Sequence, residues 1–567
     1  MDTQRLVLFF VFAFSILMLW DAWQKTQHPP EVKPAQQSQS GIPAPAATAP
    51  AAVHPPAVPQ SKPGDVPAVT VPSSAVPAPA APVAGAQALP RERIRTRTDT
   101  LAVEIDSLGG DIVYVELLNH RDTLDQNKNF VLLGPEHQYF AQSGLIGTGL
   151  PNHRTPYKVV EKEAALAPGK DSLEIKLEAA GPEGSKVTKV ITFHRGSYVI
   201  DVRHHIANGG PGPIAAHAYY QITRDGKSPA GETAMLQTYT GGAVYTDQEK
   251  FLKVAFGDID KNKAAYPKTA DNGWIALLQQ YFVAAILPPE KTQREFYTRR
   301  LAENFYAAGV ILPLPSIAPG ASAQSSVRMF VGPQDQDLLQ AVAPGLDLVV
   351  DYGWLTVIAA PLFWLLQLFH NWTGNWGLAI ILLTVVIKGI FFPLSAASYR
   401  SMAKMKLVTP RLTKLREQYG DDRMKMNQAM MDLYKQEKIN PLGGCLPIVV
   451  QIPVFIALYW ALLASVELRH APFYLWIHDL SAADPYYVLP ALMMASMVLQ
   501  TRMNPTPPDP VQAKVMMIMP FVFGVMFFFF PSGLVLYWLV NNILSIAQQW
   551  QITRMIEGER AVSAARR

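Results

Sequence analysis

Hydrophobic positions follow two different patterns along this chain. Between residues 91 and 345, apolar and polar residues alternate in short runs separated by Gly, Pro and Asn, which is typical of half-buried strands. After residue 350, the apolar residues come in blocks about as long as a membrane-spanning helix. The alternation is clearest in LAVEID (101–106), DIVYVELL (111–118), LEIKLEAA (173–180), KVTKVITFH (186–194) and SYVIDVRHHI (197–206). We therefore predict a β-sandwich domain over 91–345, followed by a polytopic α-helical membrane region.

The apolar blocks predict where the chain crosses a membrane. Five spans are expected at about 375–394, 446–465, 486–503, 515–531 and 533–551.

A shorter apolar block, Leu6–Trp20, follows Arg5 and lacks the small-x-small pattern of a signal peptidase site. It predicts an uncleaved N-terminal transmembrane anchor over 1–23, with a cleaved signal peptide as the alternative. Residues 24–90, called the tether below, are dominated by Pro, Ala, Val and Gln and are expected to be disordered.

Charge placement predicts the topology. The loop over 395–444 contains ten Lys or Arg and five Asp or Glu, which favours the cytoplasm. The aromatic run 354–369 would reverse that placement if it crossed the membrane, so 346–373 is predicted to be an amphipathic helix lying along the outer interface. The tail over 552–567 is basic, as expected of a cytoplasmic end.

The cytoplasmic loop has helical periodicity of its own. Apolar residues recur three and four positions apart from Met405 to Tyr419, and Gly420 then provides a helix stop. This predicts an antiparallel helical hairpin over 399–440. It is either a small structural coiled coil or a docking arm. The docking surface would comprise Met402, Met405, Met424, Met426, Met430, Met431, Asp421 and Asp422.

Composition excludes several classes of function. The 567 residues are 49% hydrophobic and 17% charged, which fits an integral membrane protein with a large soluble domain. The single cysteine, Cys445, excludes an intramolecular disulfide and a cysteine metal cluster. His204 and His205 are adjacent on a predicted strand and point to opposite faces, which is poor geometry for a metal ion. No Walker loop, G-x-S-x-G or H-E-x-x-H motif is present, so neither an enzyme nor a cofactor is predicted.

Lys388 is a lone cation in the first of the five expected spans, at about 375–394, and Arg400 is the next charged residue after it. A cation at membrane depth costs about 2.5–3.5 kcal/mol and usually faces a bundle interior or a wet cavity. The alternative is a lysine that snorkels to the surface. Polar residues in the same and other spans are expected to form a hydrophilic groove with it, although each alone would serve as interhelical glue. These residues are Thr384, Gln451, Asn541, Asn542 and Ser545.

Several motifs resemble the YidC/Oxa/Alb family of membrane insertases. They are PLGGCLP (441–447) followed by QIP (451–453), GDDRMKMNQAMMDLYKQEKINPLGGC (420–445), VELRHAPFYLWIHDLSAADPYYVLP (466–490) and FPSGLVLYW (530–538). The likeness is dense over 375–551, and the order of anchor, tether and β-domain is that of the Gram-negative type. Lys388 stands where the family usually has arginine. Tyr537 and Trp538 stand where relatives often have two tyrosines, and both join the expected groove.

The resemblance implies a monomeric five-helix core with a groove open to lipid and cytoplasm. Such a core would move short hydrophilic segments of nascent inner-membrane proteins across the bilayer and release their apolar helices into lipid, alone or with the Sec translocon. Implied partners are nascent membrane proteins, the Sec translocon with its accessory subunits, the ribosome, the signal-recognition-particle receptor and membrane lipid. Nucleic acid would be met only through the ribosome. The chain would lie in the inner membrane with both termini cytoplasmic and the large domain periplasmic.

Two other functions compete with the insertase. A solute transporter or channel with a periplasmic binding domain would need an inverted repeat, and five core spans argue against one. A structural scaffold would depend on its β-domain and not on the groove. The β-domain of the family resembles sugar-processing sandwiches, but fold alone does not make it a glycosidase.

Overall fold

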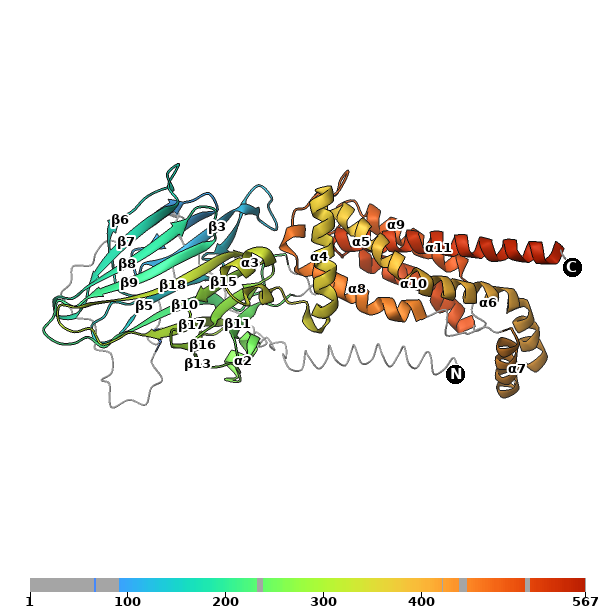
Figure 1. Ribbon diagram of the computed structural model, residues 1–567, viewed down its shortest axis with the longest axis horizontal. Coiled ribbons are helices and arrows are strands. Elements are labelled where there is room, and N and C mark those ends of the chain that lie inside the picture. The colour runs from blue at the N-terminus through green and yellow to red at the C-terminus, as the bar shows by residue number, and fades with distance from the viewer. Residues whose placement is uncertain are drawn as a thin grey trace, which may run out of the picture. The chain divides into compact units, whose positions relative to one another are not determined.

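The computed structural model describes residues 66–67, 91–231, 238–420, 422–437, 446–504 and 510–565 (Figure 1). The chain divides into two compact units, Met1–Pro333 with Gln340–Val349, and Gln334–Leu339 with Val350–Arg567. The predicted anchor, nearly all of the tether, Asp421 and Cys445 lie outside the described residues.

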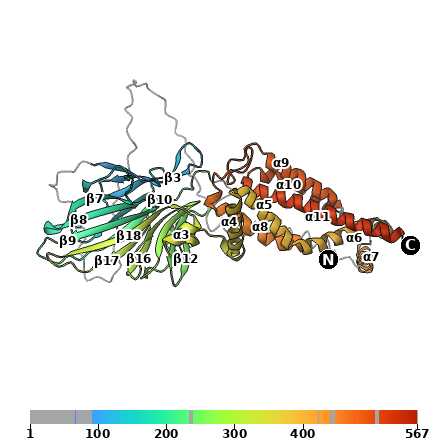
Figure 2. The same cartoon turned by 45° about the horizontal axis from the view of Figure 1, so that its top comes forward.

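The first unit contains two antiparallel sheets, which lie face to face (Figure 2). The first sheet has the order β1 (Arg93–Arg97), β2 (Leu101–Asp106), β3 (Asp111–Arg121), β5 (Phe140–Ile146), β10 (His217–Asp225), β17 (Phe305–Pro313), β16 (Arg294–Ala302) and β13 (Thr269–Ala270), with β4 (Asn129–Leu133) paired to β3. The second has the order β12 (Lys250–Val254), β11 (Gly241–Thr246), β14 (Trp274–Gln279), β15 (Phe282–Leu287), β18 (Ser322–Pro333), β9 (Val199–Ala207), β8 (Lys186–His194), β7 (Ser172–Ala180) and β6 (Lys158–Glu161). A short helix, α2 (Phe256–Asp260), follows β12.

The core lies between the two sheets. Strand β7 alternates buried and partly exposed side chains as its sequence predicts, whereas β14 and β15 are buried along their whole length because both faces are covered. The Tyr220 hydroxyl of β10 donates to Ser325 Oγ of β18 at 3.1 Å, which links the sheets. The predicted β-sandwich is confirmed, and the five alternating runs fall in β2, β3, β7, β8 and β9. His204 is buried and His205 is exposed, as their adjacent positions require.

The second unit is helical. After α3 (Gln336–Val342), which lies across the division between the units, it contains α4 (Thr356–Thr373), α5 (Trp376–Ile390), α6 (Phe392–Tyr419), α7 (Arg423–Gln436), α8 (Leu446–Ala464), α9 (Val488–Met503), α10 (Pro510–Phe527) and α11 (Ser532–Ala565). Among the described helices, none alone has the length and apolar character needed to cross a membrane. A bent pair, Trp376–Ile390 with Phe392–Met405, has both, and α8, α9 and α10 contain shorter apolar helices.

The helix of the span predicted at about 375–394 is interrupted near its end. The chain bends by 66° between α5 and α6. Pro393 explains the break, because a proline inside a continuous helix would clash with the carbonyl one turn earlier and remove a hydrogen bond. Near the start of α6, the missing N–H costs nothing. At the other end of α5, the Asn375 side chain accepts from the Leu378 N–H at 3.1 Å and caps the helix.

Helix α4 has two unlike faces. Phe363, Leu366 and other apolar side chains are buried on one side, while Trp364 and Trp372 are exposed on the other. The helix predicted over 346–373 is therefore present from Thr356 to Thr373 only, and its position at a membrane interface stays a prediction.

The hairpin consists of α7 and the second half of α6, which lie side by side. Its small core contains Val408, Leu412 and Tyr434, against which Met405, Met430 and Leu433 pack. Asp422 accepts from the Lys425 N–H at 3.1 Å and caps α7.

The loop between α8 and α9 is tightly built. Asp484 is buried and accepts hydrogen bonds from the Trp476 indole at 3.0 Å and from the backbone N–H groups of Tyr486 at 3.0 Å and Leu489 at 2.7 Å. The last of these lies in the first turn of α9, so the carboxylate caps that helix.

The same loop also packs against α5. The Phe473 ring lies over Gly377, where an added Cβ would stand 2.0 Å from the ring. A residue larger than glycine therefore requires the ring to move.

Candidate functional site

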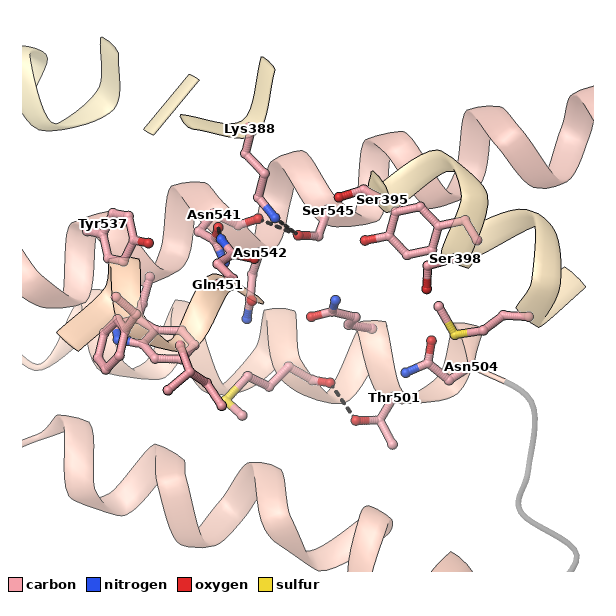
Figure 3. Close-up of a pocket in the computed structure, with 17 residues that line it drawn as sticks. Lys388, Ser395, Ser398, Gln451, Thr501, Asn504, Tyr537, Asn541, Asn542 and Ser545 are labelled. Atoms are coloured by element: carbon pink, nitrogen blue, oxygen red, sulfur yellow. Dashed lines mark hydrogen bonds between the residues drawn. The ribbon is translucent and has the colours of Figure 1, made fainter. Parts of the chain in front are cut away.

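A cavity of about 350 Å³ lies among α5, α6, α8, α9 and α11 (Figure 3). On α6, α9 and α11 the lining side chains recur every three or four positions, because that spacing places residues on one face of a helix. The lining consists of Lys388 from α5; Ser395, Ser398, Tyr399 and Met402 from α6; Gln451, Ile452 and Phe455 from α8; Met497, Gln500, Thr501 and Asn504 from α9 and its end; and Tyr537, Trp538, Asn541, Asn542 and Ser545 from α11.

Lys388 is the only charged residue among these described lining residues. Its side chain is 5% exposed, and its Nζ donates to Ser545 Oγ at 2.7 Å. Ser545 Oγ in turn donates to the Asn541 carbonyl oxygen at 2.7 Å. Within the described part of the chain, no carboxylate pairs with Lys388, so a neutral oxygen is its hydrogen-bond acceptor. A buried cation without a counter-ion keeps most of its desolvation cost, and an incoming carboxylate would reduce that cost.

Amide side chains join the helices around the cavity. Gln451 Nε2 donates to Asn541 Oδ1 at 2.7 Å, which ties α8 to α11. Asn542 Nδ2 donates to Ser496 Oγ at 3.3 Å, which ties α11 to α9. These groups therefore act as interhelical hydrogen bonds and also as the polar wall of the cavity.

The cavity changes character along its length (Figure 3). At one end, near Tyr537, the Phe455 and Trp538 rings meet edge to face with centroids 4.5 Å apart. Toward the other end lie Ser398 and Asn504, and the Asn504 side chain accepts from Gln549 Nε2 at 3.0 Å. One end is thus amphipathic and aromatic, and the other carries small hydroxyl and amide groups.

Seven of the eight predicted groove residues line this cavity, and Thr384 does not. Thr384 is fully buried and its Oγ1 donates to the Ile380 carbonyl oxygen at 2.7 Å. One helical turn separates it from Lys388, and its hydroxyl is satisfied by its own helix. Its place in the predicted groove is therefore corrected.

Sequence reasoning missed the α6 and α9 walls of the cavity. The missed residues of these walls are Ser395, Ser398, Tyr399, Met497, Gln500, Thr501 and Asn504, together with Met402, which was assigned to the hairpin. One signal was available, because the apolar stretch of α9 ends early, at Gln500. The bend after α5 turns α6 toward the cavity, and the hydrophobic pattern of the sequence did not indicate it.

The six hairpin methionines do not form one docking surface. Met405 and Met430 pack in the hairpin core, and Met402 lines the cavity. Met424 and Met431 are exposed, at 83% and 42%. In a helical hairpin, one face of each helix packs against the other helix and the opposite face is exposed. Methionines on different faces of the same helix therefore do not share one surface. This leaves Met424 and Met431 as exposed apolar groups near the turn and along α7.

Comparisons with known proteins identify the family. Two family profiles match, the YidC periplasmic domain over residues 93–365 and the 60Kd inner membrane protein over residues 368–559. The chain belongs to the YidC family. The resemblance in the sequence motifs is therefore confirmed, and the β-sandwich is the periplasmic domain of an inner-membrane protein. The family is one of insertases, in agreement with the expectation that the chain is not an enzyme.

Full-length relatives carry the same assignment. The membrane protein insertase YidC of Dechloromonas aromatica is 56% identical and covers 100% of both chains. That of Nitrosospira multiformis is 57% identical over 99% of this chain and 98% of its own. A crystal structure of an active YidC insertase with its first transmembrane domain resolved covers 81% of this chain and 93% of its own, at 17% identity and a TM-score of 0.36.

Proposed function

We propose that this chain inserts membrane proteins by admitting a short hydrophilic segment into the cavity beside Lys388. The observation that carries the proposal is a buried cation whose acceptor is neutral, in a cavity whose described lining contains no carboxylate. An acidic or polar segment entering from the cytoplasm would find a positive charge and many hydrogen-bonding groups. Those contacts reduce the desolvation cost that normally stops a polar segment from entering a bilayer.

The size of the cavity limits what enters. A volume of about 350 Å³ corresponds to on the order of ten water molecules at about 30 Å³ each. A few residues of an extended segment would fill it, so short hydrophilic segments are the expected cargo. The apolar helix that follows in the substrate would then pass into lipid. Burial of about 20 apolar residues, at about 25 cal/mol per Å², supplies the driving force without nucleotide.

The surrounding parts have proposed roles of their own. The exposed Trp364 and Trp372 of α4 support a position at the outer membrane interface, where tryptophan is enriched. Both termini would lie in the cytoplasm, and the core would cross the membrane several times. The hairpin would meet the ribosome or the signal-recognition-particle receptor, and the periplasmic domain would meet the Sec translocon. Nascent membrane proteins and lipid are the partners that the cavity itself supports.

Reconstitution tests this function directly. A newly translated single-span protein is added to liposomes containing only this chain, and protease protection of the substrate is compared with empty liposomes. We expect protection only where the chain is present. Equal protection in both would overturn the insertase function, and ion or solute flux through the same liposomes would then favour the transporter alternative.

A further inference from the structure

Two residues of the Pro-rich tether are placed against the periplasmic β-sandwich. Val66 is half-buried and Pro67 is buried. Arg299 of β16 donates from Nη1 to the Val66 carbonyl oxygen at 3.2 Å. A Pro-, Ala- and Val-rich stretch that stayed in solvent would leave both residues exposed. The contact therefore marks a place where the sandwich holds the tether.

Arg299 is held in position by its neighbours on the sheet. Its guanidinium carbon lies 5.4 Å from the centroid of the Tyr297 ring, two residues earlier and so on the same face of β16. The Tyr297 ring crosses over Gly309 of β17, where an added Cβ would lie 2.5 Å from Tyr297 Oη. Glycine at this position leaves the room that the ring needs. The arginine thus stands on an aromatic platform before any peptide reaches it.

The platform continues as a row of hydrogen bonds across the sheet. Tyr297 Oη donates to Gln221 Oε1 at 2.9 Å, Gln221 Nε2 donates to Gln142 Oε1 at 2.8 Å, and Gln142 Nε2 donates to Asp111 Oδ2 at 2.9 Å. The strand register aligns this row, because Gly309 pairs with both Tyr297 and Gln221, and Gln221 pairs with Gln142. Such a network fixes the orientation of Tyr297 and lowers the entropy lost on binding.

The row lies on the face of the sheet that points away from the second sheet. Tyr220, adjacent to Gln221 on β10, donates to Ser325 of the second sheet, so Gln221 points the other way. The site is therefore separate from the core of the sandwich.

The tether segment suits such a site. A residue before proline is restricted to extended conformations, so Val66 presents its carbonyl at little conformational cost. Val-Pro occurs at 58–59, 66–67, 71–72 and 76–77, but only Val66 follows an acidic residue, Asp65. Burial, and then the nearby charge of Arg299, lowers the pKa of Arg154, so two guanidinium groups lie close together here. Charge complementarity thus favours this Val-Pro over the other three.

We propose that the outer face of this sheet, around Arg299 and Tyr297, is a docking site for the Val66–Pro67 segment of the chain's own tether. Docking would leave residues 24–65 as the free stretch on the N-terminal side. At about 3.1 Å per residue of polyproline II, these 42 residues span about 130 Å, against about 210 Å for the 67 residues of the undocked tether. The periplasmic domain would therefore be held on a shorter tether than the sequence alone suggests.

Distance measurements between spin labels on the full-length chain test the proposal. With Cys445→Ser as background, one label is placed at Thr70→Cys, beyond the docked segment, and one at Arg328→Cys, an exposed position on β18. We expect one narrow distance distribution. A free tether would give a broad distribution. Thr70 would then be joined to the start of β1, at Arg93, by about 23 residues of flexible chain, whose end-to-end distance is about 25–30 Å.

Variants on both sides of the contact separate docking from a folding defect. Arg299→Ala should broaden the distribution about twofold or more, and so should Val66→Gly/Pro67→Gly, which leaves the sandwich unchanged. Arg300→Ala, an exposed arginine that follows Arg299 on the strand, is the matched control and should keep it narrow. A broad distribution in the unmodified chain, or a narrow one that survives both the arginine and the tether variants, would overturn the proposal.

Discussion

Replacing Lys388 by methionine separates the effect of the buried cation on stability from its effect on insertion. Methionine has a similar length and no charge, and after the change Ser545 Oγ still donates to the Asn541 carbonyl oxygen. A lysine at membrane depth costs about 2.5–3.5 kcal/mol, and the charged hydrogen bond to Ser545 offsets about 1.5–3 kcal/mol of that cost. The free energy of unfolding of the helical unit should therefore rise by about 0–2 kcal/mol.

Thermal unfolding, followed by the circular dichroism of the helices in lipid nanodiscs, measures this change. For a unit of about 220 residues, a change of 1 kcal/mol in the free energy of unfolding shifts the midpoint temperature of unfolding by about 2–4 °C. We therefore expect Lys388→Met to raise this midpoint by up to about 8 °C. Insertion by the same variant should fall. Lys388→Arg is the control, because it keeps the charge and should keep insertion. A fall of more than about 4 °C for Lys388→Met would refute the reasoning, since the lysine would then be a structural contact.

Three further predictions concern the loop between α8 and α9. Asp484→Ala leaves one buried donor, the Leu489 N–H, and two part-buried donors without their acceptor, and should lower the free energy of unfolding by about 2–4 kcal/mol; an unchanged unfolding midpoint would contradict the capping role. Gly377→Ala should destabilise the unit through the Phe473 ring, and Phe473→Ala should relieve that effect in the double variant; strictly additive losses would argue against the contact. Burial, and then the nearby Asp335 and Asp337, raises the pKa of Glu467 to about 7. Because the folded state then binds its proton more tightly, stability should fall as pH rises from about 4.5 to about 7, and unfolding curves of Glu467→Gln should lack that slope.

The sequence predicted the sandwich because its strands expose one face, and alternation is then visible residue by residue, as in β7 and β8. It predicted the polar residues that α11 contributes to the cavity for a related reason. Asn541, Asn542 and Ser545 are polar residues in an apolar helix, and such residues turn toward one another. The same rule placed Thr384 in the groove, and that prediction is wrong. A threonine hydroxyl can also donate to a carbonyl oxygen of its own helix, as Thr384 does to Ile380.

What the sequence did not show depends on contacts between distant segments. The bend at Phe392 brings Ser395 and Ser398 to the cavity, and periodicity within one block does not reveal a change of direction. The hairpin methionines look alike in sequence, and only the packing of α6 on α7 separates Met405 from Met424. The contact of Arg299 with Val66 joins residues 233 positions apart, in a stretch whose composition predicts no structure at all.

Exchanging charge between the insertase and its substrate tests the central claim most directly. A single-span substrate with an acidic leading segment, and a version with lysine in place of the acidic residues, are each added to liposomes containing the unmodified chain or Lys388→Glu. If Lys388 attracts the entering segment, the unmodified chain should protect the acidic substrate, while Lys388→Glu should lose that substrate and gain the lysine version. Equal protection of both substrates by both chains would contradict the account, because the cavity would then admit segments without regard to charge.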